Sequence, residues 1–218
     1  MTELAVLVPV LKRPHRVQTI IEAFASTTPD HTLYFIPDTD DCSEIEAIEN
    51  AGGNILYRSP GENYATKINI GCELTSEPLI FLGADDLGPE AGWFDYAKAC
   101  IEGGAQVVGI NDLIPRSRFH TTHFLITRDY AQQPLITGER GPLCELYDHS
   151  CVDDELIATA TKRRVYAYEE RARVQHFHPD VRSAPWDPVY AKGRAKMAED
   201  RKLWRSRHYW HIERNGHV

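Results

Sequence analysis

Cysteine pairs, long hydrophobic runs and repeats are all missing from this chain of 218 residues, and each absence excludes a class of protein. The five cysteines are widely spaced and include no CxxC pair, which argues against a zinc site and against a disulfide scaffold. The apolar run at residues 4–11 is too short to span a membrane. It also follows Glu3 rather than a basic segment, unlike a signal peptide. We therefore expect a cytoplasmic protein with free thiols and no membrane association.

Internal repeats, low-complexity segments and a linker between domains are absent as well. The hydrophobic content of 42% and the charged content of 26% are ordinary for a globular protein that is long enough to build a core. We expect one domain, and no obligate protein partner is evident from the sequence.

Charge is distributed unevenly along the chain, whose net charge is -8. Residues 192–218 contain eight Lys or Arg and only three acids, so this tail is basic and the remainder is strongly acidic. Trp204, Tyr209 and Trp210 lie among those bases, and such a mixture can grip a polyanion or stack on nucleic-acid bases. We favour the alternative, a terminal helix whose aromatic side chains pack on the body of the protein.

Strand and helix patterns alternate over the first 112 residues. Apolar runs predict strands at 4–10, 32–36, 54–57, 79–82 and 106–110. Helical spacing predicts helices at 13–26, 43–51, 63–74 and 90–101, with Ser43 as the N-cap of the second. This alternation predicts an α/β fold with a doubly wound, mostly parallel sheet and helices on both faces.

Beyond Asp112 the pattern loosens. A strand at 121–127 and a short helix at 128–132 precede residues 133–149, which are rich in Gly, Pro and charge and predict a long loop or lid. A helix at 153–161, an extended segment at 165–168 and a C-terminal helix from Val189 complete the prediction.

Two adjacent carboxylates, Asp85 and Asp86, follow directly after the apolar run that ends at Leu82. Open α/β sheets bind their ligands at the carboxyl ends of strands. Carboxylates are hard oxygen ligands that suit Mg²⁺ or Mn²⁺, with a nucleotide diphosphate on the remaining coordination positions. The alternative is an Asp-rich turn, since Asp also favours turns through local hydrogen bonds.

The chain resembles GT-A glycosyltransferases of the family 2 type in an ordered series of segments over residues 4–112. In that family the first strand ends in a Val/Ile-Pro step, here Val8-Pro9, ahead of a loop along which the nucleotide lies. The acidic loop after the second strand, which contains Asp38 and Asp40, corresponds to the family's contact with the base.

Two later segments continue this resemblance. The family has a helix that carries a basic residue and an Asn, which correspond here to Lys67 and Asn69. The family's Asp-X-Asp motif corresponds here to Gly83, Ala84 and Asp85. The family usually has Asp where this chain has Gly83. The last Asp of the motif is typically the direct metal ligand, which implies Asp85 here, with Asp86 as a possible substitute for the lost acid.

The second half supplies a candidate general base. Residues 152–156 resemble the Glu-Asp-X-Asp-Leu segment of family 2 enzymes, in which the Asp takes the proton of the acceptor hydroxyl. This register selects Asp153, and a slip of one residue selects Asp154. The alternative is that acids at the start of a helix only complement its dipole.

A pair of histidines supplies further candidate metal ligands. GT-A enzymes often recruit a His from the C-terminal half, and His176 and His178 point to the same side of an extended segment. The run resembles the His-X-His-Pro segment of phage-encoded enzymes, in which an Asp-X-X-Tyr element follows. Here Asp187 and Tyr190 match that element.

The resemblance implies a GT-A-like catalytic domain over residues 1–190, with a nucleotide-sugar half at 1–112 and an acceptor and base half at 113–190. The basic aromatic helix or tail then occupies 191–218. The implied activity is a glycosyltransferase of the hexosyl or pentosyl class that needs Mn²⁺ or Mg²⁺. It would move a sugar from a nucleotide-sugar, a UDP-sugar foremost, to an acceptor hydroxyl, with inversion if the analogy holds.

Other functions stay open. A phage-encoded enzyme acting in the cytoplasm of a host cell would have modified DNA as one candidate acceptor, beside a protein, a saccharide or a small molecule. A non-catalytic module that binds nucleotide-sugars is an alternative, with Gly83 as a sign of lost catalysis. A nucleotidyltransferase is another, although the basic loop at residues 11–14 has no Gly to hold a triphosphate.

Overall fold

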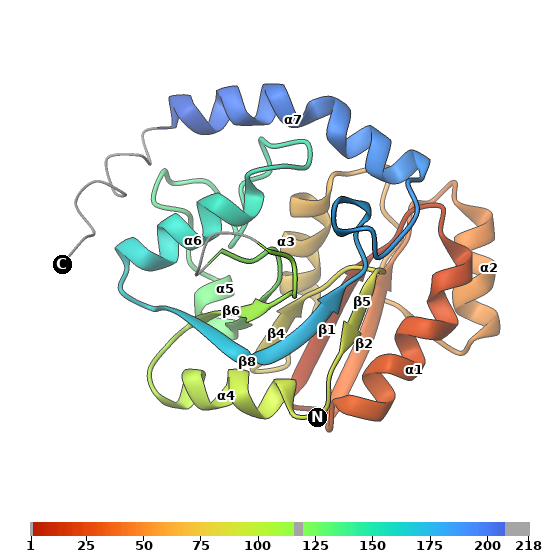
Figure 1. The fold of residues 1–218 in the computed structure, drawn as a ribbon, viewed down its shortest axis with the longest axis horizontal. Coiled ribbons are helices and arrows are strands. Elements are labelled where there is room, and N and C mark those ends of the chain that lie inside the picture. The colour runs from red at the N-terminus through yellow and green to blue at the C-terminus, as the bar shows by residue number, and fades with distance from the viewer. Residues whose placement is uncertain (1, 116–119, 208–218) are drawn as a thin grey trace.

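A mixed sheet of eight strands organises the part of the chain that this computed structural model describes, residues 2–115 and 120–207 (Figure 1). The strand order is β3-β2-β1-β4-β7-β6-β8-β5. The strands are β1 (Leu4–Pro9), β2 (His31–Ile36), β3 (Asn54–Ile55), β4 (Leu79–Leu82), β5 (Leu87–Pro89), β6 (Val107–Asn111), β7 (Phe124–Thr127) and β8 (Tyr166–His176). The α-helices are α1 (Val17–Thr27), α2 (Cys42–Asn50), α3 (Tyr64–Leu74), α4 (Trp93–Glu102), α5 (Arg128–Ala131), α6 (Val152–Lys162) and α7 (Pro188–Ser206). Two short 3-10 turns, η1 (Pro14–Arg16) and η2 (Pro179–Val181), complete these elements.

The N-terminal half of the sheet is parallel. Strand β1 lies between β2 and β4, and its Leu7 is in register with Tyr34 on one side and Leu82 on the other. Strand β7 is antiparallel to both β4 and β6, and β5 is antiparallel to β8. Four of the seven pairings between the described strands are parallel, which confirms the predicted mostly parallel sheet.

Helices cover both faces of the sheet because alternate strand residues point to opposite sides. On one face Leu4, Val6 and Val8 of β1 pack in a core with residues from α1, α2 and α4. On the other face Leu7 joins a second core with residues from α3, α5 and α6. The central strands β1 and β4 are therefore apolar throughout, with β1 buried from Leu4 to Val8. The doubly wound arrangement predicted from the sequence is confirmed.

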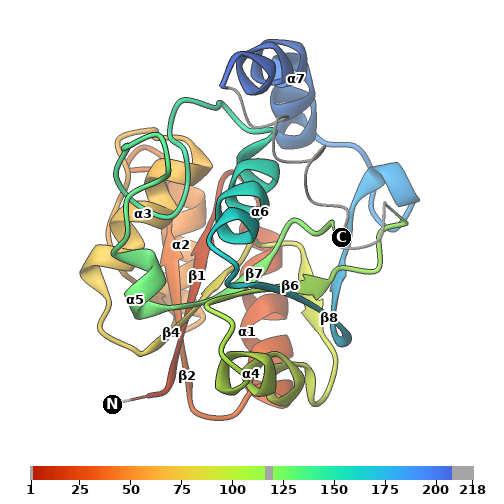
Figure 2. The same ribbon diagram turned by 90° about the vertical axis from the view of Figure 1, so that its left-hand side faces the viewer.

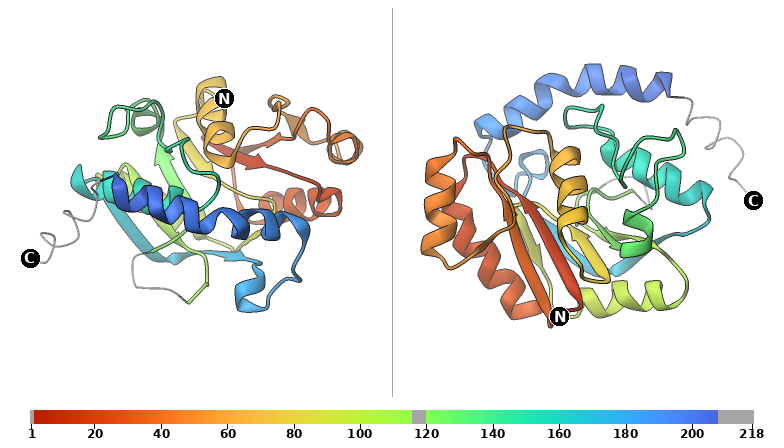
Figure 3. Two further views of the ribbon diagram at one scale, coloured as in Figure 1. Left: turned by 90° about the horizontal axis from the view of Figure 1, so that it is seen from above. Right: turned by 180° about the vertical axis from the view of Figure 1, so that it is seen from behind.

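Helix α7 crosses the edge of the sheet at which the parallel strands end, and α6 lies beneath it (Figures 1 and 2). Seen from above, α7 runs across this edge from the β5–β8 side (Figure 3). Asp200 of α7 is buried and accepts hydrogen bonds from the backbone N–H groups of residues 148, 149 and 150, at 2.9, 3.0 and 2.7 Å. Arg207 follows the helix and donates to both carboxylate oxygens of Glu155 in α6, at 2.8 Å each.

These polar contacts fix α7 on the body of the protein. Of the aromatic residues predicted to dock this segment, Trp204 packs against the second core, whereas Tyr209 and Trp210 lie outside the described residues. No helix in the described ranges is long and apolar enough to cross a membrane.

Three local expectations were wrong. Helix α2 is capped by Asp41, whose side chain accepts from the N–H of Glu44, and not by Ser43. Strand β5 lies in a stretch that the sequence left unassigned. Strand β8 extends to His176, well past the predicted end at residue 168. This extension brings His176 to the carboxylate pair, as described below.

Candidate active site

The carboxylates Asp85 and Asp86 lie in the turn between β4 and β5 and are 9% and 6% exposed. The turn starts at Gly83, whose N–H donates to the Leu7 carbonyl at 2.9 Å. A Cβ atom at Gly83 would lie 2.9 Å from that same carbonyl oxygen, closer than Cβ atoms normally approach. The close approach of two strands therefore favours glycine where the family motif has Asp.

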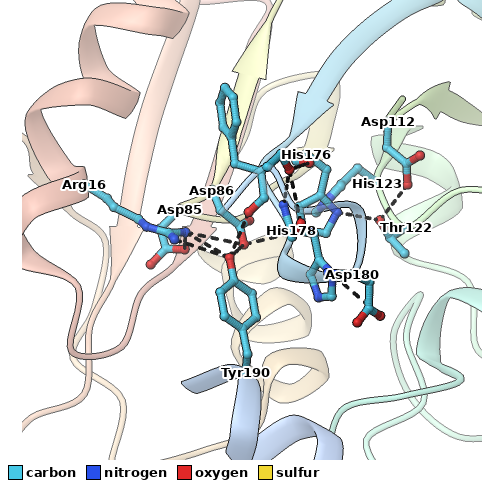
Figure 4. Close-up of polar contacts among 12 residues, drawn as sticks. Arg16, Asp85, Asp86, Asp112, Thr122, His123, His176, His178, Asp180 and Tyr190 are labelled. Atoms are coloured by element: carbon cyan, nitrogen blue, oxygen red, sulfur yellow. Dashed lines mark hydrogen bonds and ion pairs between the residues drawn. The ribbon is translucent and has the colours of Figure 1, made fainter. Parts of the chain in front are cut away.

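Two arginines of the loop after β1 neutralise this carboxylate pair (Figure 4). The guanidinium of Arg13 lies 2.9 Å from Asp85 and 3.7 Å from Asp86. Arg16 lies 3.4 Å from Asp85 and 3.5 Å from Asp86. Buried charges are tolerated when they are paired and hydrogen-bonded, and these four groups satisfy that condition together.

The start of α7 completes the surroundings of Arg13. Asp187, the N-cap of α7, accepts from Nε and Nη2 of Arg13 at 2.8 and 3.0 Å. The Tyr190 ring lies under the same guanidinium, 4.0 Å away from its centroid, in a cation–π contact. The Tyr190 hydroxyl donates to Asp86 at 2.7 Å. Loop, turn and C-terminal helix therefore meet at one cluster of charges.

His176, at the end of β8, approaches Asp86 from the other side, with Nε2 3.4 Å from Oδ2 (Figure 4). The rings of His123 and His178 contact the His176 ring at centroid distances of 5.0 and 5.2 Å. His178 also contacts the Tyr190 ring, and its Nδ1 accepts from the N–H of Asp180. The two predicted histidines thus lie side by side, and His176 is the one in contact with Asp86.

The electrostatic environment separates the two aspartates. Burial and the neighbouring Asp86 raise the pKa of Asp85 to about 6, against the opposing effect of Arg13. Burial also acts to raise the pKa of Asp86, but hydrogen bonds from His176 and Tyr190 outweigh it, and the pKa lies below its ordinary value. Burial and Asp86 together raise the pKa of Tyr190 to about 12. Asp86 is therefore the more firmly ionised carboxylate of the pair.

The donor set suits a hard divalent cation, although it is not assembled around one. Oδ1 of Asp86 is buried and has no hydrogen-bond partner among the described residues, so it is a free lone-pair donor. Within the same part of the chain, no three His, Cys, Asp or Glu side chains are arranged to hold a metal ion. Arg13 and Arg16 supply the positive charge instead. A cation bound by Asp85 would have to displace the Arg13 guanidinium.

The predicted nucleotide residues lie on the neighbouring strand ends. Pro9 ends β1, and Ala84 is half-buried in the turn after β4. Asp38 follows β2 and pairs with the buried Lys67 of α3, with 2.5 Å between Nζ and Oδ1. Asp40 is exposed in the same loop as Asp38. The pair of Asp38 and Lys67 joins this loop to α3 below the edge of the sheet.

Asn69 has all of its amide contacts inside the protein. Its Nδ2 donates to the Leu143 carbonyl at 2.9 Å and to Glu145 at 2.8 Å, and its Oδ1 accepts from the Leu143 N–H at 3.1 Å. These bonds tie the predicted lid, residues 133–149, to α3. The structure therefore gives Asn69 a role in holding this loop.

The candidate bases Asp153 and Asp154 lie in the first turn of α6, with side chains that are 20% and 36% exposed. His120 contacts both carboxylates, Asp154 at 3.0 Å and Asp153 at 3.7 Å. The Tyr64 hydroxyl donates to the Gly83 carbonyl at 3.2 Å, and burial, followed by the charge of Asp153, raises the pKa of this phenol. Asp153 is the less exposed of these two carboxylates.

Several residues of the cluster were not among the predicted site residues. Arg13, Arg16 and Tyr190 contact the carboxylates directly, and Asp187 holds Arg13. The Asp-X-X-Tyr match was the available signal for the two residues of α7. Nothing in local periodicity indicated that the loop arginines would reach the end of β4.

Fold and site together define a GT-A-type α/β architecture with a buried acidic pair at the carboxyl end of its central strands. No protein-family model matches the sequence, and no curated protein matches it either. Solved structures do match.

The crystal structure of glucosyl-3-phosphoglycerate synthase from Mycobacterium tuberculosis in complex with Mn²⁺, UDP and glucosyl-3-phosphoglycerate has a TM-score of 0.63 at 12% identity, over 90% of this chain and 78% of that one. The complex of that enzyme with Mn²⁺, UDP-glucose and phosphoglyceric acid matches with a TM-score of 0.61 at 13% identity, over the same shares of the two chains. Its complex with Mg²⁺ and UDP has a TM-score of 0.60 at 14% identity, over 90% of this chain and 77% of that one. At these identities the likeness establishes a shared fold.

Proposed function

We propose that this protein is a metal-dependent glycosyltransferase that moves a sugar from a nucleotide-sugar to an acceptor hydroxyl. One observation carries the proposal: the buried pair of Asp85 and Asp86 lies at the carboxyl end of β4, in contact with His176 from the end of β8. Carboxylates and imidazole at this edge of a GT-A fold suit a diphosphate-bound divalent cation.

The donor would lie along the carboxyl ends of β1, β2 and β4. We assign the base and ribose to the loop at Asp38 and Asp40, and the diphosphate to the region of Arg13, Arg16 and the aspartate pair. The two guanidiniums are the charges best suited to phosphate oxygens. The structural neighbours bind UDP or UDP-glucose, which supports a UDP-sugar as the donor.

Asp85, Asp86 and His176 would hold Mn²⁺ or Mg²⁺, and the orphaned Oδ1 of Asp86 is the observation that supports this assignment. The neighbours were solved with Mn²⁺ or Mg²⁺. A bound cation supplies charge neutralisation on the leaving diphosphate and orients it. Because Arg13 pairs with Asp85, donor binding and release of this pairing would be linked.

The chain's own residues would carry out the remaining chemistry. We assign Asp153 as the general base that takes the proton of the acceptor hydroxyl, and a single displacement then inverts the anomeric centre. Asp154 is the alternative general base. Its contact with His120 at 3.0 Å favours an auxiliary role for this carboxylate. Tyr64, whose hydroxyl donates to the Gly83 carbonyl just before the aspartate pair, would limit the access of water.

The acceptor is the least defined part of the proposal. Helix α7 carries an excess of Lys and Arg beside the site, which is the feature that keeps modified DNA among the acceptors to test, next to a saccharide, a protein or a small molecule.

Slow hydrolysis of the donor tests the proposed function without knowledge of the acceptor. The purified protein is incubated with UDP-sugars and GDP-sugars with and without Mn²⁺, and release of the nucleoside diphosphate is followed by ion-exchange chromatography. We expect metal-dependent release from one donor, lost in Asp85→Asn. Binding without any release would favour the non-catalytic module. Release of pyrophosphate from a nucleoside triphosphate would favour a nucleotidyltransferase.

A further inference from the structure

A chain of polar contacts lies behind His176, on the side away from Asp86 (Figure 4). Nδ1 of His176 is 3.4 Å from the Thr122 hydroxyl oxygen, and this hydroxyl donates to Oδ2 of Asp112 at 3.0 Å. None of the proposed steps of sugar transfer uses Thr122 or Asp112. Both residues are nevertheless connected to the candidate metal ligand.

Three neighbouring segments of the sheet build this chain. Asp112 directly follows β6, Thr122 lies just before β7, and His176 ends β8. The backbone N–H of His176 donates to the Asp112 carbonyl at 3.1 Å, so the same residue holds both the backbone and, through Thr122, the ring. Asp112 is 2% exposed and His176 is 9% exposed. The arrangement is therefore buried and fixed by strand pairing.

The direction of the hydrogen bonds follows from the count of protons. The Thr122 hydroxyl donates its single proton to Asp112. The Thr122 oxygen then offers only lone pairs to His176, and the ring nitrogen that faces it, Nδ1, must carry the proton. In the neutral ring this leaves the lone pair on Nε2.

The Nε2 atom of His176 faces the lone pairs of the Asp86 carboxylate. Nε2 of His176 lies 3.4 Å from Oδ2 of Asp86, and Oδ1 of Asp86 has no hydrogen-bond partner among the residues described. Two acceptors at this distance repel each other, so in the metal-free protein Nε2 carries a second proton that it donates to Asp86, and a cation would take the place of that proton. Histidines that ligate metals commonly donate their other N–H to a carboxylate, carbonyl or water, which fixes the tautomer.

The opposite edge of the ring is fixed as well. His123 is buried, its Nδ1 lies 3.1 Å from the Leu82 carbonyl, and its ring meets the His176 ring edge-on. A carbonyl only accepts, so Nδ1 of His123 carries the proton. His176 therefore has little freedom to turn away from Asp86.

We propose that Thr122 and Asp112 are positioning residues, which hold His176 as the Nδ1–H tautomer and direct its Nε2 lone pair toward Asp86 for a divalent cation. The inference rests on the metal-dependent function proposed above and extends it to two residues that neither the predicted site nor the proposed mechanism includes.

The test compares three variants with the wild-type protein. Thr122→Val keeps the shape of the side chain and removes both polar contacts, whereas Thr122→Ser keeps the hydroxyl. The matched control is Thr159→Val in α6, because the Thr159 hydroxyl is buried and has no hydrogen-bond partner within the described ranges. Mn²⁺ binding is measured without donor, by the loss of the free-ion signal in electron paramagnetic resonance. Protonation of Nδ1 in His176 is read from the ring ¹⁵N shift of that nitrogen in the metal-free protein.

We expect Nδ1 of the wild-type ring to be protonated, whereas neutral free histidine mostly carries its proton on Nε2. Thr122→Val should weaken Mn²⁺ binding by about 10–100-fold, the usual effect of removing such a partner. Thr122→Ser should restore most of the affinity, and Thr159→Val should leave it unchanged.

Two results overturn the inference alone: a wild-type ring without a proton on Nδ1, or wild-type Mn²⁺ affinity in a folded Thr122→Val protein. A wild-type protein that binds no Mn²⁺ contradicts the metal dependence of the proposed function itself. The Nδ1 protonation is measured in the metal-free wild type, so it stays informative if Thr122→Val fails to fold.

Discussion

The guanidinium of Arg13 lies 2.9 Å from Asp85, the residue that the family motif predicts as the metal ligand. Asp187 and Tyr190 of α7 hold the same guanidinium from behind. Under the proposed function a cation and Arg13 would compete for Asp85, and α7, which holds the arginine, would take part in that competition. This relationship makes the arginine a target for separating metal binding from stability.

Replacement of Arg13 by Met should destabilise the protein and favour the metal. The change leaves Asp85, Asp86 and Asp187 buried or partly buried with less positive charge, and breaking such a buried pair costs about 3–5 kcal/mol. Added Mn²⁺ should raise the melting temperature of Arg13→Met more than that of the wild type, measured by differential scanning fluorimetry. Arg58→Met, which breaks an exposed ion pair with Glu49, is the matched control. An equal Mn²⁺ response in Arg13→Met and the wild type would contradict the competition.

Glu44 should make stability depend on pH. It is fully buried and accepts from the Arg13 N–H at 2.6 Å, and burial, opposed by this bond, raises its pKa to about 7, with further contributions from Asp85 and Asp41. The folded protein thus binds this proton over a range in which the unfolded chain has released it. The stabilisation is complete below the ordinary pKa of 4.5 and is lost as the pH rises through about 7.

The expected loss from this group is roughly 2–3 kcal/mol between about pH 5 and pH 8, from the size of the pKa shift. Urea unfolding at several pH values measures it. Glu44→Gln should flatten the curve, whereas Glu46→Gln, an exposed change on the same helix, should not. Parallel curves for the wild type and Glu44→Gln would show that the group does not titrate in this way.

Asp153→Asn should leave donor affinity unchanged and slow transfer by about 10²–10⁴-fold, the usual contribution of a general base. Asp154→Asn, one residue along the same turn, is the comparison, and its effect should be small. Donor affinity is measured by calorimetry and transfer with any acceptor that supports turnover. If Asp154→Asn abolishes transfer and Asp153→Asn does not, the register of the base is wrong by one residue.

Asp200→Ala should loosen the contact of α7 with the segment before α6. Its carboxylate accepts from three backbone N–H groups. A hydrogen bond to a charged group contributes about 1.5–3 kcal/mol to the free energy of unfolding. We expect a loss of at least 2 kcal/mol in urea unfolding, since buried N–H groups lose their partner. Glu199→Ala, at the exposed neighbouring position, should have little effect. Similar losses in both variants would mean that helix propensity, not capping of the loop, is the cause.

The N-terminal half of the fold was predictable because its signals are local. Strands β1, β2 and β4 are continuous apolar runs, and the helices between them carry regular apolar spacing. The cap of α2 was misassigned because Asp41 and Ser43 are both good caps, and only the hydrogen bond to the Glu44 N–H decides between them.

Strands β5 and β8 depended on tertiary contacts. Strand β5 has three residues, Leu-Gly-Pro, which carry no alternation, and it forms by pairing with β8. The middle of β8 is exposed and charged, so its sequence does not look like a strand. Its pairing with β6 and β5 determines its length.

Part of the candidate site was likewise predictable from the sequence, and part of it was not. The aspartates and His176 were predictable from residue chemistry at strand ends, together with the family resemblance. The contacts of Arg13 with Asp187 and of Tyr190 with Asp86 join residues 174 and 104 positions apart. A local sequence pattern carries no information about contacts between residues so far apart in the chain, so only the fold could place these residues.

The central claim is that the aspartate pair binds a nucleotide-sugar together with a divalent cation. Isothermal titration calorimetry of the wild type against a panel of nucleotide-sugars, with and without Mn²⁺, tests it most directly. We predict binding of one donor, a UDP-sugar, that requires Mn²⁺ and is lost in Asp85→Asn. Binding that is equally strong without metal, or that survives in Asp85→Asn, would contradict the account.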